Sequence, residues 1–110
     1  MSFAEVGYDE QLALARGELA RLVLRLRSLS PAAWRTRRKA TLATFARLAE
    51  ISATAEHRRM PALPKVADHA LADAIAVVGG DAIAALATEP DADLLSAVVA
   101  TLREALETTR

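Results

Sequence analysis

Two histidines and several carboxylates are the side chains of this sequence that could bind a metal ion. His69 and Asp73 are four positions apart, so a helix would place both on one face, where each could supply a ligand. His57 could complete the set, because helical bundles build metal sites from imidazoles and carboxylates on facing helices. The sequence has no Glu-x-x-His motif and no cysteine ligand. It predicts no resident cofactor and leaves a divalent metal at His57, His69 and Asp73 as an alternative.

Basic residues form a second candidate site. Arg35, Arg37, Arg38 and Lys39 stand close together in one helical stretch, and clusters of this kind contact phosphate groups in nucleic-acid-binding proteins. The whole chain is neutral, with 14 basic and 14 acidic residues, and no groove-reading motif is recognisable. Anion or nucleic-acid binding is therefore an alternative, and nucleic acid is not the partner that we expect.

Nucleophilic catalysis has weaker support. The absence of cysteine excludes thiolate chemistry and disulfide bonds. No serine lies on a strained turn beside a histidine, and no Gly-rich phosphate loop follows a strand. These observations favour a protein without enzymatic activity, although they leave the question of an enzyme open.

The composition predicts the elements that must position these side chains. Alanine, the best helix former, supplies about a quarter of the residues, and β-branched residues never alternate as a strand requires. Apolar residues recur at intervals of three and four in four stretches, which predicts an all-α fold. The predicted helices span residues 9–29, 31–59, 65–87 and 91–109 of a single domain, 1–110, with residues 1–8 as an N-terminal arm. Short connections predict a four-helix bundle with up-down-up-down topology.

The helix boundaries and the glycine pair need separate interpretation. Ser30 and Pro31 predict a helix start, because the hydroxyl can cap free amides and proline loses no bond at the first helical position. Gly79 and Gly80 would normally suggest a break. The apolar period continues through them in phase, so we expect a continuous helix in which small residues allow another helix to approach closely.

Apolar residues exceed what four helices need for one central seam. A symmetric homodimer is the usual way to cover such a surplus. The alternative is a wide core within a monomer. The predicted interface residues are Leu14, Leu24, Ala72, Ala76, Gly80, Ala84, Leu94 and Val98.

We expect a soluble, cytoplasmic protein that is not inserted in a membrane. The first residues lack the basic-then-apolar layout of a signal peptide. The most apolar stretch, 66–87, contains Asp68, Asp73 and Asp81, which are too many charges for a membrane span. The first 60 residues carry 11 basic and 6 acidic side chains and the rest carry 3 and 8, so the two halves attract each other.

One part of the sequence resembles a known family. Residues 19–22 (Leu-Ala-Arg-Leu) and 29–34 (Leu-Ser-Pro-Ala-Ala-Trp) resemble the end of helix one and the start of helix two in actinobacterial DinB-like proteins. That superfamily includes the N-terminal domains of mycothiol-dependent maleylpyruvate isomerases, which are four-helix bundles, often dimeric, and often bind a divalent metal through three histidines. The chain departs from the family at Leu48 and Ala49, where a metal histidine would fall, and its last helix has no histidine. The resemblance implies a bundle and puts the metal-dependent activity in doubt.

The sequence as a whole predicts a homodimeric protein-interaction or scaffold module. The surplus of apolar helical surface favours this function over the two alternatives. Those alternatives are a DinB-like metal-binding enzyme with a degenerate site and an anion-binding or nucleic-acid-binding protein that uses the first two helices.

Overall fold

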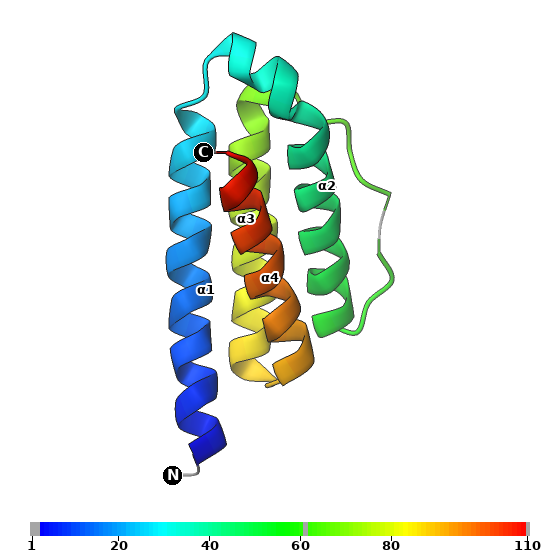
Figure 1. The fold of residues 1–110 in the computed structure, drawn as a ribbon. Coiled ribbons are helices and arrows are strands. Elements are labelled where there is room, and N and C mark those ends of the chain that lie inside the picture. Colours follow the sequence, from blue (N-terminus) through cyan, green and yellow to red (C-terminus); the bar gives the residue numbers. More distant parts are fainter. Residues whose placement is uncertain (1–2, 61, 110) are drawn as a thin grey trace.

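The computed structural model describes residues 3–60 and 62–109, and the described residues form four α-helices (Figure 1). The helices are α1 (Phe3–Arg27), α2 (Pro31–Ala55), α3 (Asp68–Thr88) and α4 (Ala92–Thr108). No strand occurs among these residues, so the predicted all-α four-helix class is confirmed.

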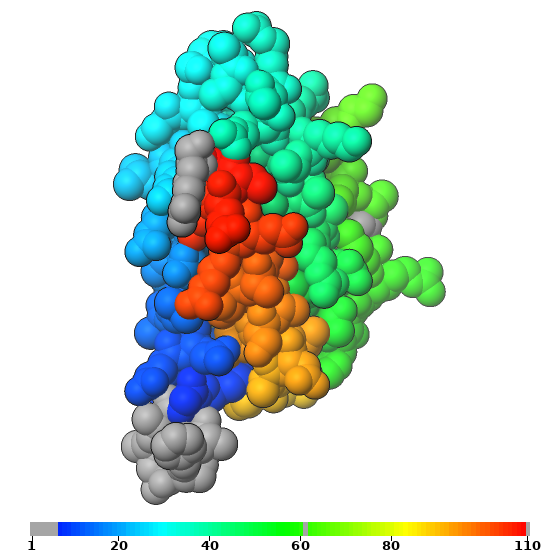
Figure 2. Space-filling model, viewed as in Figure 1, coloured from blue at the N-terminus to red at the C-terminus, as the bar shows by residue number. Residues whose placement is uncertain are grey.

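The order of the helices around the bundle differs from their order in the sequence. α1 packs against α3 and α4, and α2 also packs against α3 and α4, whereas the backbones of α1 and α2 do not come close to each other within the described part of the chain. Figure 2 shows one consequence, because α4 lies between α1 and α2 on the face in view. The two helices of the first hairpin are therefore diagonal to each other.

The helix directions also differ from the prediction, because α2 and α3 run parallel (Figure 1). Arg38 near the start of α2 pairs with Asp68 at the start of α3, with Nε and Oδ1 3.1 Å apart. His57, just after α2, lies 3.0 Å from Glu89, just after α3. The connection between α2 and α3, described over residues 56–60 and 62–67, runs back along α2 before α3 begins. The predicted up-down-up-down topology is therefore wrong, and the observed one is up-down-down-up.

α2 ends earlier than the predicted residue 59. The amide of Arg58 donates to the Ala53 carbonyl at 3.0 Å, and the amide of His57 donates to the Thr54 carbonyl at 3.1 Å. His57 has φ 56°, in the left-handed region. This arrangement is a Schellman motif, which ends a helix by satisfying its last carbonyls. The sequence did not predict this motif, because glycine usually occupies the left-handed position.

α1 starts at Phe3, so the predicted arm of residues 1–8 is instead helical over the part that the structure describes. Tyr8 attaches this end of α1 to the rest of the bundle. Its hydroxyl donates to the Leu86 carbonyl at 2.5 Å and accepts from the Asp91 amide at 3.1 Å. These bonds fix α1 to the turn between α3 and α4.

The predicted start of α2 is confirmed. Ser30 caps the helix, with its hydroxyl accepting from the Ala33 amide at 3.2 Å, and Pro31 occupies the first helical position. Asp91 caps α4 in the same way, through a bond from the Leu94 amide at 3.0 Å. Side-chain oxygens at these positions satisfy amides that the helix leaves without partners.

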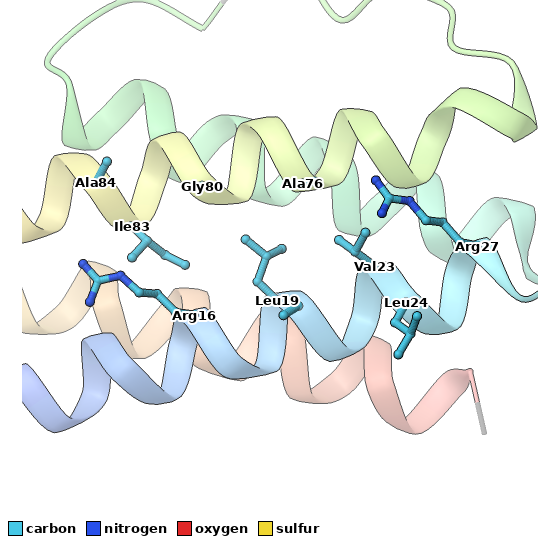
Figure 3. Close-up of a pocket in the computed structure, with 10 residues that line it drawn as sticks. Arg16, Leu19, Val23, Leu24, Arg27, Ala76, Gly80, Ile83 and Ala84 are labelled. Carbon is cyan, nitrogen blue, oxygen red and sulfur yellow. The ribbon is translucent and has the colours of Figure 1, made fainter.

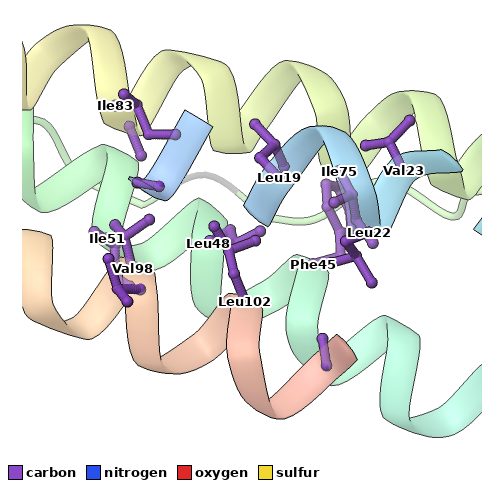
Figure 4. Packing of buried hydrophobic residues seen from close by; sticks show 14 of the residues in the cluster. Leu19, Leu22, Val23, Phe45, Leu48, Ile51, Ile75, Ile83, Val98 and Leu102 are labelled. Carbon is purple, nitrogen blue, oxygen red and sulfur yellow. The ribbon is translucent and has the colours of Figure 1, made fainter. Parts of the chain in front are cut away.

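The core contains apolar side chains from all four helices (Figure 4). Leu22, Leu48, Ile75 and Leu102 are almost fully buried, one from each helix. Ser52 is buried beside them, and its hydroxyl has no hydrogen-bond partner in the described chain. The seams predicted from the three-and-four spacing thus form the centre of the bundle.

α3 is continuous through its glycine pair, as predicted. Gly79 lies directly against α1, since a Cβ on it would come 2.8 Å from Leu19 Cδ1, whereas a Cβ on Gly80 would meet nothing within 4 Å. By length and composition α3 is the one described helix that could cross a membrane, and 39% of its apolar window is buried in the bundle. The helix therefore combines a core face with an uncovered apolar face.

Candidate functional site

The predicted metal ligands lie at opposite ends of the bundle. His57 is beside Glu89 at the end of α3, whereas His69 and Asp73 belong to its first turns. The 20 residues from His69 to Glu89 correspond to about 30 Å of helix. Asp73 is already paired with Arg27, with Oδ1 and Nη2 2.5 Å apart. The structure therefore does not bring the predicted set together, and no group of three potential ligands converges elsewhere among the described residues.

The predicted basic cluster is partly used within the fold. Arg38 pairs with Asp68 of α3, and Arg37 also has a partner, so neither offers a free guanidinium. Lys39 and Arg35 are exposed. The attraction expected between the two halves of the chain thus takes the form of specific ion pairs, whereas the side chains of Arg35 and Lys39 have no partner in the described chain.

Two of the predicted interface residues belong to the core. Val98 is 0% exposed and Ala72 is 3% exposed, so neither contributes an accessible surface. Their small or branched side chains pack inside the bundle because their helix faces point toward its axis. Placing Val98 and Ala72 in an interface was therefore wrong.

The remaining interface residues divide between two faces. Leu14 and Leu24 are ten positions apart on α1, which separates their directions by about 80° around the helix axis. Leu24 lies on the edge nearer α3, in contrast to Leu14, which does not border the groove described below. Leu94 of α4 is half-buried. Most of the predicted interface residues that remain accessible thus lie on one face of the bundle, formed by α1 and α3.

A groove of about 590 Å³ runs between α1 and α3 (Figure 3). Leu19, Val23 and Ile83 lie between the two helices, and Arg16 and Arg27 stand at opposite ends. Small residues on α3 leave the groove open on that side, because their side chains project little beyond the backbone. On α3 the small residues that line the groove are Ala76, Gly80 and Ala84, all among the predicted interface residues.

Two large apolar side chains near this groove are the most exposed of their kind in the described chain. Leu24 borders the groove and is 67% exposed, and Val77, next to Ala76 on α3, is 63% exposed. Leu24 is one of the predicted interface residues, whereas Val77 was not predicted. The neighbouring Asp73 and Asp81, four positions to either side of Val77, could have shown that this face of α3 points outward.

Glu18 is a further residue whose position the sequence did not predict. It lies on the side of α1 that meets α4 and is only 9% exposed. Its oxygens are 3.7 Å from Arg21 and 4.0 Å from Arg103. Two arginines thus flank the carboxylate at the α1–α4 boundary, where it contributes to packing between helices.

Comparison with protein-family models, curated proteins and solved structures finds no match for this chain. The resemblance to DinB-like proteins therefore stays a prediction. The site has to be interpreted from its own residues.

Proposed function

We propose that the protein is a homodimeric interaction module that associates through the α1–α3 face. The observation that carries this proposal is the exposure of Leu24 beside an apolar groove with a floor of small residues. Exposed apolar side chains are unfavourable in water, and a contiguous patch of them is typical of an interaction surface. Metal-dependent catalysis has no comparable support, because the candidate ligands are far apart.

A second copy of the chain is the partner that this surface fits best. A twofold interface uses the same patch on both subunits, so that patch must contain both the projecting group and its recess. The α1–α3 face has both, with Leu24 as the projection and the groove around Gly80 as the recess. Helices approach closely where one of them presents small side chains.

The size of the face is appropriate for a dimer. α3 has 21 residues, which gives a length of about 30 Å, and two helices side by side are about 20 Å wide. The resulting area is about 600 Å², close to the roughly 800 Å² per partner of a standard interface. Exposed apolar residues on the adjoining face of α1, such as Leu14, can supply the remainder.

Light scattering coupled to size exclusion tests the proposal with two matched variants. Leu24→Glu places a charge at the groove, and we expect it to convert a dimer into a folded monomer. Leu42→Glu is the control, because Leu42 is also partly exposed, at 37%, but lies on α2 away from the groove. It should leave the dimer intact.

Two results would contradict the proposal. A wild-type monomer at high concentration would show that the face has another occupant, and flotation of the protein with lipid vesicles would then indicate a membrane. A dimer that survives Leu24→Glu but dissociates with Leu42→Glu would move the interface to α2.

A further inference from the structure

A second cavity lies at the corner where α1 ends and α2 and α3 begin. Its volume is about 610 Å³, within the range of small-molecule sites. Leu26, Leu29, Pro31 and Ala72 give it apolar walls, and Trp34 adds an aromatic ring. Sites for small molecules typically combine walls of this kind with a few polar groups that orient the ligand.

The polar groups of this corner cavity are mostly hydrogen-bond donors without acceptors. Trp34, Arg35 and His69 line the cavity, and none of their side chains makes a hydrogen bond or ion pair with another described residue. An indole N–H donates only, a guanidinium donates only, and an imidazole offers at least one N–H. A ligand that supplies acceptor oxygens would complement this set.

The acidic groups nearby are already neutralised. Asp68 lines the cavity but lies 3.1 Å from Arg38, and Asp73 on the next turn of α3 is bound to Arg27. Each of these pairs has no net charge, so Arg35 is left as an uncompensated cation at the cavity wall. The local field therefore favours an anion.

We propose that this corner cavity binds a small carboxylate that carries a flat apolar ring. The carboxylate accepts hydrogen bonds from Arg35 and His69, because a guanidinium matches the planar geometry of a carboxylate. The ring lies against Trp34 and the apolar wall formed by Leu29 and Pro31. The residues that hold the carboxylate and the ring lie outside the α1–α3 groove, which shares only Arg27 with this cavity, so the site does not depend on the proposed dimer.

The single tryptophan of the chain makes the test direct. In a ¹H–¹⁵N correlation spectrum Trp34 gives the only indole N–H signal, so its shift reports on this cavity. Benzoate is the probe, and benzamide is its neutral isostere. We expect a saturable shift of the Trp34 indole and the His69 amide with benzoate, with a dissociation constant of about 1 mM for so small a ligand.

Matched variants separate this cavity from general charge effects. Arg35→Gln should weaken benzoate binding about tenfold, as expected for the loss of a charge-assisted hydrogen bond. Arg59→Gln removes the same charge from the connection after α2 and should leave binding unchanged. Both positions are exposed, so both variants should fold, and thermal unfolding checks this.

Several outcomes would overturn the proposal. Equal binding of benzoate and benzamide would mean that the cavity does not recognise the charge. Inorganic phosphate that binds as tightly as benzoate would mean that the ring contributes nothing. The absence of a saturable shift by about 10 mM benzoate, or an equal effect of Arg35→Gln and Arg59→Gln, would exclude the site.

Discussion

The two flanks of α3 are covered to very different extents. Toward α2, α3 packs in parallel, with the Arg38–Asp68 ion pair at its start and the His57–Glu89 hydrogen bond just after its end. Toward α1, Gly79 admits the side chain of Leu19, but one residue later Gly80 opens onto the groove. Both flanks are rich in alanine and branched residues. Apolar composition therefore does not determine coverage, which depends on where the neighbouring helices lie.

The largest expected effect separates the core face of α3 from its outer face. Ile75 is fully buried, so Ile75→Ala should lower the free energy of unfolding by about 3 kcal/mol. Val77 is 63% exposed, so Val77→Ala should change it by less than about 0.5 kcal/mol. Urea unfolding at low protein concentration measures both values. Equal losses would mean that Val77 is covered even in the isolated chain.

The glycine pair gives a smaller and more local comparison. Gly80→Ala should raise the free energy of unfolding by about 0.5–1 kcal/mol, because alanine favours helix and the new methyl group meets open space. Gly79→Ala should lower it by about 1 kcal/mol, because Leu19 must shift to make room. Both substitutions are best compared on a Leu24→Glu background, where each reports on the monomer. Equal stabilisation would show that α1 does not pack closely on Gly79.

The smallest effects concern the ion pairs on the two flanks. Glu89→Gln removes the partner of His57 beside α2, and Asp73→Asn removes the partner of Arg27 beside α1. All four side chains are largely exposed, so each loss should be below about 1 kcal/mol and should diminish in salt. Thermal unfolding at two ionic strengths measures them. A loss several times larger at either pair would show that this flank depends on charge more than on packing.

Local patterns predicted the helices well, because a helix depends on residues within a few positions of each other. Ser30 and Pro31 predicted the start of α2, and the apolar period to which Leu71 and Ile75 belong predicted the core face of α3. The left-handed conformation of His57 at the end of α2 was not predicted, because this position usually holds glycine.

The topology could not be predicted from the same patterns. Short connections imply antiparallel neighbours, but the segment 56–67 is long enough to return along α2, and no local rule states that it does. Because α3 runs parallel to α2, the predicted metal ligands His57 and His69 are at opposite ends of the bundle. The groove beside Leu24 follows from the same arrangement, since α1 meets only one flank of α3.

The most direct test of the account is paramagnetic broadening between two differently labelled copies. The chain has no cysteine, so Ala87→Cys, on the exposed last turn of α3, provides a single site for a nitroxide label. The nitroxide-labelled protein, at natural isotope abundance, is mixed with ¹⁵N-labelled wild type. We predict broadening of amide signals along the α1–α3 face, including those of Leu24 and Gly80. Broadening confined to α2 and α4, or no broadening at concentrations where a dimer is present, would contradict the proposed interface.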